Sequence, residues 1–263
     1  MIYVMSDIHG YLDLLKERVG QILSRLQKDD KIIFLGDYID VGAQSRQTLE
    51  YLRSLQSGYP ENVIVLKGNH EQWFLDSILD RGWDDWFMSD EGMATSRTFM
   101  TEEQLAECRS KLSNGGRSAY YTYMRNRIRD NYPDLLKWTD ALPLYYETET
   151  QIFVHAGVDE DAGERWKTAT DEHTLMNKYP AQLGMFCKDI IAGHTGTAVI
   201  AGDRDFHGIF HDGMSHFYID STVQKSGFLN VLAYSEVSGK YYSLNRIGQL
   251  EPVKKYEFLA HRL

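Results

Sequence analysis

Five short apolar runs in this chain each end in side chains that can bind metal ions. The endings come from both halves of the sequence and are Ser6-Asp7-Ile8-His9-Gly10, Gly36-Asp37-Tyr38-Ile39-Asp40, Gly68-Asn69-His70-Glu71, His155-Ala156-Gly157 and Gly193-His194-Thr195. Asp, Asn and His side chains cost free energy at the end of a buried strand unless a positive charge collects them. Oxygen and imidazole donors together suit borderline or hard divalent ions. The pattern therefore predicts one metal centre at the edge of a sheet.

The same residues could hold two divalent ions. Asp7 and His9 are two residues apart, so in extended backbone their side chains would project to the same side and could share one ion. Asp37 offers two carboxylate oxygens and could bridge both ions, and three further donors would complete the second site: Asn69, His155 and His194. Each ending also contains a glycine, which lets the backbone turn sharply near the ions. Two metals about 3.5–4 Å apart can polarise phosphate and generate hydroxide near neutral pH.

The elements that would position these residues alternate over the first part of the chain. The pattern predicts strands at 2–5, 31–35 and 62–66 and helices at 11–27, 45–56 and 71–80. Helices between short apolar runs indicate crossover connections and a largely parallel sheet. In such sheets ligands gather beyond the carboxyl ends of the strands, which is where Asp7, Asp37 and Asn69 stand.

Residues 81–140 carry no strand signal. Aromatic residues alternate there with acidic and basic ones: Trp83, Trp86, Phe87, Tyr120, Tyr121, Tyr123 and Trp138. The pattern predicts a mainly helical insertion that covers one side of the site. We expect its aromatic residues to form a small core of their own, with stacking on a substrate as the alternative.

Strand signals return after the insertion, at 151–154 and 189–192, and continue between 198 and 246. Segments 228–234 and 241–244 are typical of antiparallel strands joined by a turn at Ser238-Gly239. These strands predict a second sheet packed on the first. No Pro-rich or low-complexity linker divides the chain, so we expect one α/β (α+β) domain over 1–263 that contains the insertion.

Composition narrows the class of protein. A chain of 263 residues and 30.4 kDa fits one large domain, and its net charge of −10 argues against a nucleic-acid binder. Anionic substrates remain possible because bound divalent ions invert the local field. Only Cys108 and Cys187 are present, which is no disulfide framework. The chain has no basic leader and no apolar stretch near ~20 residues, so we expect a cytoplasmic protein without a membrane segment.

The five endings, together with Asn114-Gly115-Gly116, resemble the calcineurin-like metallophosphoesterases. More narrowly they are similar to the bacterial branch of the phosphoprotein phosphatases, which includes lambda-type Ser/Thr phosphatases and symmetrical diadenosine-tetraphosphate hydrolases. The resemblance runs from Asp7 to the late β segments. It implies a four-layer αββα sandwich of two mixed sheets, and a phosphorylated substrate.

The resemblance also implies roles for individual residues. One metal would be held by Asp7, His9 and Asp37, and the other by Asp37, Asn69, His155 and His194. Asn69 would contact the substrate as well. His70 would be the general acid, oriented by Asp40; the alternative is that His70 is only a capping residue. The implied mechanism is in-line attack on phosphorus by a metal-bridging hydroxide, with manganese as the expected metal and iron or zinc as alternatives.

The chain departs from the family at the residues that bind phosphate. The family motif is Gly-Asp-x-x-Asp-Arg-Gly, whereas this chain has Asp40-Val41-Gly42 and so lacks the arginine. A second arginine of the family aligns loosely with Lys178. A guanidinium binds phosphate through two parallel hydrogen bonds, which valine cannot do and lysine does only as a point charge. Either another cation takes over the grip, or the substrate is a diester or polyphosphate held elsewhere. The candidate cations are Arg46, Arg97, Arg117 and Lys178, with Arg117 as the first choice.

Two classes of function fit these residues. Asp40 is retained, whereas diadenosine-tetraphosphate hydrolases commonly lose this acid, and this favours a phosphomonoesterase that resembles protein Ser/Thr phosphatases. The enzymatic alternative is a nucleotide or dinucleoside polyphosphate hydrolase or a phosphodiesterase. The alternative from another class is a non-catalytic metal- and phosphate-binding module, against which the intact pair of Asp40 and His70 counts.

Overall fold

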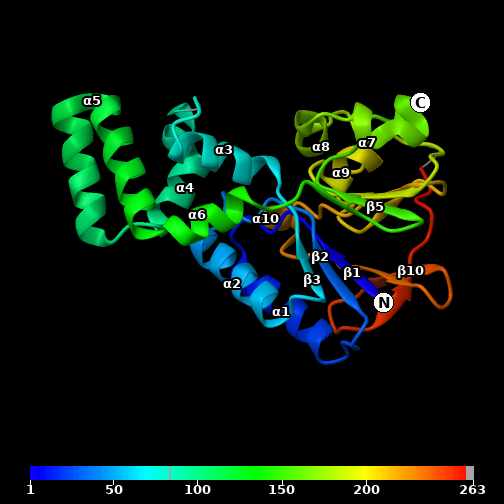
Figure 1. The fold of residues 1–263 in the computed structure, drawn as a ribbon. Helices are drawn as coiled ribbons and strands as arrows, with labels where there is room; N and C mark the ends of the chain where they lie inside the picture. The colour runs from blue at the N-terminus through cyan, green and yellow to red at the C-terminus, as the bar shows by residue number, and fades with distance from the viewer. Residues whose placement is uncertain (83, 259–263) are drawn as a thin grey trace.

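The fold is built on two mixed β-sheets (Figure 1). The computed structural model describes residues 1–82 and 84–258. The first sheet has six strands in the order β11 (Leu250–Pro252), β10 (Lys240–Leu244), β9 (Leu232–Ser235), β1 (Ile2–Met5), β2 (Lys31–Phe34) and β3 (Val63–Val65). Strands β1, β2 and β3 are parallel, as predicted, and β9 to β11 run antiparallel beside them.

The second sheet has five strands. Their order is β4 (Tyr145–Glu147), β5 (Gln151–Val154), β6 (Asp189–Ala192), β8 (His216–Tyr218) and β7 (Phe210–His211). The central strands β5, β6 and β8 are parallel, and the two edge strands are antiparallel to them. Each sheet therefore has three parallel strands whose carboxyl ends can carry ligand loops.

Alternation along the strands divides the core between two faces of each sheet. In β1, Ile2 and Val4 join the core between the sheets, while Tyr3 and Met5 face the helices of the first sheet. Phe153 of β5 enters the same inter-sheet core from the other side. Side chains of a strand alternate between its two faces, so a strand buried on both faces reads as a continuous apolar run. This is why β1, β2 and β5 were recognisable from sequence.

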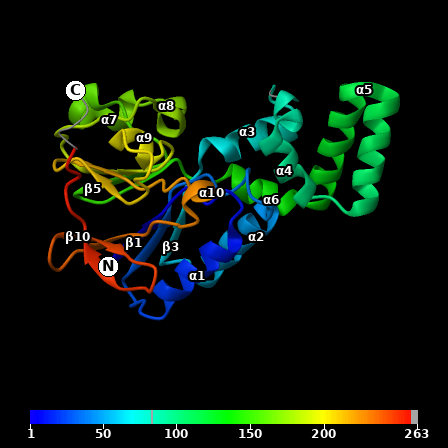
Figure 2. The ribbon, with the colours of Figure 1, turned by 180° about the vertical axis from the view of Figure 1, so that it is seen from behind.

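Helices cover the outer face of each sheet. The first sheet carries α1 (Leu12–Leu23), α2 (Ser45–Gly58) and α3 (Asn69–Ile78). The second carries η2 (Glu160–Arg165), α7 (Trp166–Ala169), α8 (Glu172–Asn177) and α9 (Thr197–Ala201), and α10 (Val223–Ser226) lies near the junction of the sheets (Figures 1 and 2). The order helix, sheet, sheet, helix confirms the predicted αββα sandwich.

Between β3 and β4 the chain folds into helices alone. These are η1 (Asp84–Met88), α4 (Asp90–Thr98), α5 (Glu102–Asn131) and α6 (Pro133–Asp140). α5 is interrupted at Gly116, where φ is 69°, and Figures 1 and 2 show its two parts side by side at the end of the molecule away from the second sheet. Within the described residues, no helix has the length and apolar character that a membrane crossing requires.

The described aromatic residues of the insertion are buried or partly buried, but the expected separate core was wrong. Trp86 and Phe87 belong to the core that also contains Leu15 of α1 and Phe74 of α3. The inserted helices pack directly on α2 and α3, so their apolar side chains extend an existing core. Trp83 lies outside the described residues.

Sequence patterning also misplaced some β structure. The predicted strand 228–234 begins only at Leu232. Asn230 lies outside the strand, and its side-chain Nδ2 donates to the carbonyls of His207 and Ile219. β4, β7, β8 and β11 were not recognised as separate elements. Two or three residues are too few to establish an alternating pattern.

Cys108 is buried and Cys187 exposed, and both are free thiols.

Candidate metal centre

The five polar endings meet at one place, because each follows a parallel strand of one of the two sheets. Hydrogen bonds join endings of the first sheet to endings of the second. Asn69 Oδ1 lies 2.8 Å from His155 Nε2 and 3.0 Å from His194 Nδ1. The carboxylate of Asp7 accepts the backbone N–H of His194 at 3.1 and 3.2 Å. The structure thus brings together side chains from both halves of the chain.

Asp37 lies at the centre of the cluster. It forms one group of potential ligands with His9 and His70, and a second with His155 and His194. Within each group the ligand atoms all lie within 4.8 Å of one another. A single carboxylate common to two groups is the arrangement that two bridged metal ions require.

Asp7 is outside both groups, in the first of which His70 stands with His9 and Asp37, and its role as a metal ligand stays a prediction. The backbone of Asp7 and His9 is not extended as expected, since both residues have left-handed φ angles, of 54° and 48°. The backbone turns here because the N–H groups of Ile8 and His9 both donate to the carbonyl of Asp37, at 2.8 and 2.9 Å.

Glycine allows the donors to approach one another. A Cβ atom on Gly68 would lie against the Oδ1 atom and backbone nitrogen of Asp37. A Cβ on Gly193 would lie against Asp7 Oδ2 and Ser6 Oγ. Any larger residue at either position would displace a carboxylate of the cluster. The sequence predicted sharp turns at the glycines, but at Gly68 and Gly193 the requirement is close packing, since neither has a positive φ.

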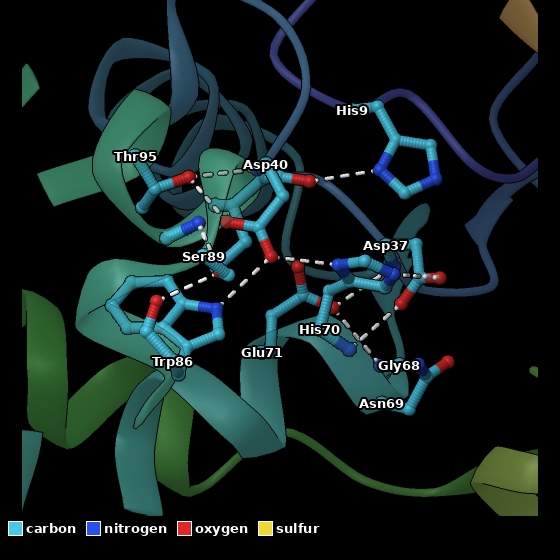
Figure 3. Close-up of polar contacts among 12 residues, drawn as sticks. His9, Asp37, Asp40, Gly68, Asn69, His70, Glu71, Trp86, Ser89 and Thr95 are labelled. Carbon is cyan, nitrogen blue, oxygen red and sulfur yellow. Dashed lines mark hydrogen bonds and ion pairs between the residues drawn. The ribbon is translucent and has the colours of Figure 1, made fainter. Parts of the chain in front are cut away.

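His70 is held by the carboxylate of Asp40, which lies beside its ring (Figure 3). Its Nδ1–H donates to Asp40 Oδ2 at 2.7 Å, while its Nε2 lies 3.8 Å from Asp37 Oδ2. Asp40 is fully buried and is itself held by the inserted helices. Trp86 Nε1 donates to Asp40 Oδ2 at 3.2 Å, and Thr95 Oγ1 donates to Asp40 Oδ1 at 2.6 Å. The insertion thus fixes the residue that orients His70.

Charge in this arrangement favours the protonated form of His70. Burial lowers the pKa of His70, but the neighbouring carboxylates of Asp37 and Asp40 outweigh it and raise that pKa to about 10. His194 behaves in the opposite way, because burial and the nearby imidazole of His155 lower its pKa to about 4. The first histidine can donate a proton, and the second is a neutral imidazole with a lone pair for a metal.

Glu71 organises the centre, a role that sequence reasoning missed. Its buried carboxylate accepts the backbone N–H groups of Asp37 at 2.9 Å, Tyr38 at 2.7 Å and Gly68 at 3.0 Å. It therefore ties the loop after β2 to the start of α3. The signal was present in the sequence, because a glutamate three residues after a helix N-cap commonly reaches back to the backbone there.

Asp220 was also missed. It follows β8, which pairs with β6 so that Ala192 lies opposite Tyr218. His194 is two residues after Ala192, and Asp220 is two residues after Tyr218. The two residues therefore follow neighbouring parallel strands at the same edge of the sheet. Burial raises the pKa of Asp7 well above its ordinary value, and the carboxylate of Asp220 raises it further. β8 is too short to be recognised as a strand, so no sequence signal placed Asp220 at its end.

The donor atoms fit divalent metal ions. His9 Nδ1 donates to the carbonyl of Ile39 at 2.9 Å, so its Nε2 carries the lone pair. Asp7 and Asp37 are each 2% exposed, and no Lys or Arg of the described chain forms an ion pair with them. Imidazoles lie beside Asp37 Oδ2 instead, with Nε2 of His155 at 3.2 Å and Nε2 of His70 at 3.8 Å. Oxygen and imidazole donors of this kind suit manganese, iron or zinc.

The structure does not bring Lys178 among these donors. Its ammonium group donates to the carbonyl of Val158 and to Glu160 Oε1, both at 2.7 Å, and to Gln182 at 2.9 Å. Its methylene groups lie against Gly157, where a Cβ atom would meet Lys178 Cδ at 2.6 Å. The side chain of Lys178 therefore packs against the loop that contains His155 and Gly157. Its charge is already compensated by Glu160.

The other candidate cations differ in position. Arg117 is exposed and follows Gly116 at the interruption of α5, which projects away from the ligand loops (Figure 1). Arg46 is held by Glu50 at 2.7 Å and by the carbonyl of Thr98 at 2.6 Å. Arg97 is exposed on α4 and lines, with Val41, a hollow of about 490 Å³. Arg46 lines the same hollow, but it is paired with Glu50, whereas Arg97 has no ion pair within the described residues.

Comparison with known proteins gives a family and a fold. The sequence profile described as "Calcineurin-like phosphoesterase" matches residues 1–198. The structure of a cold-active protein-tyrosine phosphatase of a psychrophilic Shewanella species is similar with a TM-score of 0.59 at 12% identity, over 96% of this chain and 80% of that chain. A protein proposed to be a diadenosine tetraphosphatase has a TM-score of 0.51 at 15% identity, over 92% and 91%. At these identities the two structures show a shared fold.

Proposed function

Because the chain belongs to the calcineurin-like phosphoesterase family, we propose that it hydrolyses phosphomonoesters with the help of two divalent metal ions. A phosphoric ester hydrolase is the class of enzyme to which the family assigns it. The observation that carries the proposal is the position of Asp37, which is common to two ligand groups and lies beside the His70–Asp40 pair.

The two metal sites would divide the cluster around Asp37. His9 and Asp37 would hold one ion with Asp7 nearby, and the other would be held by Asp37, Asn69, His155 and His194. Manganese suits this set of oxygen and imidazole donors, as iron or zinc also would. When bound, the two ions would polarise the phosphoryl oxygens and supply hydroxide for in-line attack near neutral pH.

The protein side chains would position the phosphate and protonate the leaving oxygen. Asn69 Oδ1 is engaged by two imidazoles, so its Nδ2 is the donor that remains for a phosphate oxygen. Asp40 binds His70 Nδ1 and leaves Nε2 directed towards the cluster, where it can donate a proton to the departing alkoxide or phenolate. Arg97, in the hollow beside Val41, is the cation we propose for the grip that an arginine at position 41 would otherwise supply.

The test is an activity assay of metal-free protein to which Mn²⁺ is restored. The substrates are p-nitrophenyl phosphate, phosphoserine and phosphotyrosine peptides, diadenosine tetraphosphate and bis-p-nitrophenyl phosphate. We expect the monoesters to be hydrolysed fastest and only with metal. Faster cleavage of diadenosine tetraphosphate or of the diester would instead assign the alternative classes.

Asp37→Asn is the matched variant for this assay. It keeps the size of the side chain and removes the bridging charge, so we expect no detectable turnover of any substrate. The exposed Asp130→Asn, on α5, is the control and should match the wild type. Substantial turnover by the Asp37 variant would exclude a bridging role for this residue. Absence of turnover in the wild type with every metal would favour a non-catalytic binding module.

A further inference from the structure

A second hollow lies beside the metal centre, at the carboxyl ends of β6 and β8. Its volume is about 790 Å³, which is within the range of small-molecule sites. It is formed by the start of α9, the segment that follows α9 and the loop between β8 and α10. Its lining includes Gly196, Val199, Arg204, His207, Asp220 and Lys225.

The hollow adjoins the ligand cluster through two short connections. Gly196 lies two residues after the proposed ligand His194, and Asp220 lies beside His194 at the end of the neighbouring strand. A Cβ atom on Gly196 would meet Thr222 Oγ1 at 2.6 Å and Asp220 Oδ2 at 3.6 Å, so the two loops are in close contact. The hollow therefore borders the loop that carries His194 and the loop that carries Asp220.

The charges in the hollow differ from those of the protein as a whole. The chain has a net charge of −10, yet two cations line this hollow: Arg204 from the turn after α9 and Lys225 from α10. Both are exposed, and neither side chain has an ion-pair or hydrogen-bond partner in the described part of the chain. His207 adds an imidazole, and Asp220 is the one carboxylate among the described lining residues.

We propose that this hollow binds a second phosphate group of the substrate while the first lies at the metal centre. Arg204 would bind phosphate oxygens through its planar guanidinium, and Lys225 would add a mobile point charge. Ala198 and Val199 form an apolar part of the wall that could contact an organic group. The substrate class is then a small phosphomonoester that carries a second phosphate group, such as a sugar bisphosphate.

The inference deepens the proposed function and rests on it, because only a phosphate bound at the metal centre makes a neighbouring phosphate site useful. Binding energy from a remote phosphate would add to the grip on the reacting phosphoryl group that we propose for Arg97. The substrate would then be held from both sides of the metal centre.

The test compares the charge-reversal variant Arg204→Glu/Lys225→Glu with wild type in the Mn²⁺-loaded state. The first measurement is the ratio of kcat/KM for fructose 1,6-bisphosphate to kcat/KM for p-nitrophenyl phosphate. We expect this ratio to fall about tenfold or more, because only the bisphosphate has a second phosphate. The second is the calorimetric Kd for tripolyphosphate, which we expect to weaken by a similar factor.

Two further variants control for charge and folding. Arg109→Glu/Lys111→Glu makes the same change of net charge on exposed residues of α5 and should leave both measurements as in wild type. Arg204→Gln/Lys225→Gln removes the charges without reversing them, in case the first variant does not fold. An unchanged ratio, or an equal loss with both substrates, would overturn the proposal, as would an unchanged tripolyphosphate Kd. If wild type hydrolyses neither substrate, the proposed function fails while calorimetry still decides whether the hollow binds polyphosphate.

Discussion

His70 and Asp40 form a buried hydrogen bond of 2.7 Å between the imidazole Nδ1 and the carboxylate Oδ2. The two residues belong to different parts of the fold, since Asp40 lies in the loop after β2 and His70 lies in the first turn of α3. Trp86 and Thr95 of the inserted helices also donate hydrogen bonds to the carboxylate of Asp40, through an indole N–H and a hydroxyl. The bond therefore connects the sheet, the first crossover helices and the insertion at the point where a leaving group would be protonated.

Asp40→Asn should lower kcat by about 10²–10⁴ for a substrate with a poor leaving group, because a neutral amide no longer favours the charged imidazole. Phenyl phosphate should lose much more than p-nitrophenyl phosphate, whose leaving group needs little protonation. Steady-state kinetics of both substrates measure the difference, with Asp130→Asn as the control. An equal loss for the two esters would exclude a role for the pair in protonating the leaving group.

Thr95→Val removes one hydroxyl that supports Asp40 and keeps the shape of the side chain. Both partners are buried, so an unsatisfied carboxylate oxygen should cost about 1–3 kcal/mol in the free energy of unfolding. We expect a smaller loss of kcat than for the Asp40 variant. Urea denaturation and kinetics test this, and Thr95→Ser should restore both values. Wild-type stability in the valine variant would show that Thr95 does not support the carboxylate.

Gly68→Ala should impair metal binding, because the added methyl group would lie against the backbone nitrogen and carboxylate of Asp37. We expect a cost of about 1–3 kcal/mol in unfolding free energy and a weaker affinity for Mn²⁺ by calorimetry. Gly20→Ala is the matched control, since nothing lies within 4 Å of the added atom. In the middle of α1 that change should stabilise the protein by about 0.5–1 kcal/mol. Unaltered Mn²⁺ affinity in the Gly68 variant would contradict the packing argument.

Val41 marks the position where the family carries a phosphate-binding arginine. It is 38% exposed with a left-handed φ of 62°, which a β-branched residue rarely adopts. Val41→Arg should raise kcat/KM for p-nitrophenyl phosphate, and Arg97→Ala should lower it if Arg97 provides the present grip. Val41→Gly controls for relief of backbone strain alone. A rise with arginine no greater than with glycine would show that a missing grip does not limit catalysis.

His216 predicts a pH dependence of stability away from the metal centre. Its Nε2 lies 3.0 Å from Glu160 Oε2 and its Nδ1 lies 3.0 Å from Asp212 Oδ2. Burial lowers the pKa of His216, but the two carboxylates outweigh it and leave the pKa raised. A group whose pKa is raised by folding contributes stability below its unfolded pKa of about 6.5, and that contribution is lost as the pH rises through the folded value.

His216→Gln should therefore destabilise the protein more at about pH 6 than at about pH 9. Urea denaturation at the two pH values measures the difference in the free energy of unfolding. His173→Gln, at an exposed position of α8, is the control and should show little effect at either pH. A larger effect of the His216 change at the higher pH would show that the imidazole is not held in its charged form.

The parallel strands and the identity of the donors could be predicted because their signals are local. β1, β2 and β5 are continuous apolar runs, and each is followed within three residues by a polar side chain. Parallel strands place such residues at one edge of a sheet. The family and the αββα sandwich follow from the same motifs, and both are confirmed. The metal and catalytic roles of the individual residues stay predictions.

What the sequence by itself determined was therefore which side chains could form a centre and on which strands they stand. Only the tertiary structure decided how they are grouped, because contacts across the fold depend on how whole elements pack. It placed His70 rather than Asp7 with His9 and Asp37, and it brought Trp86 and Thr95 to Asp40 across 46 and 55 residues. It paired Lys178 with Glu160 and placed Arg204 and Lys225 in the lining of one hollow. No local pattern encodes such pairs, since each forms only when two distant segments are folded against each other.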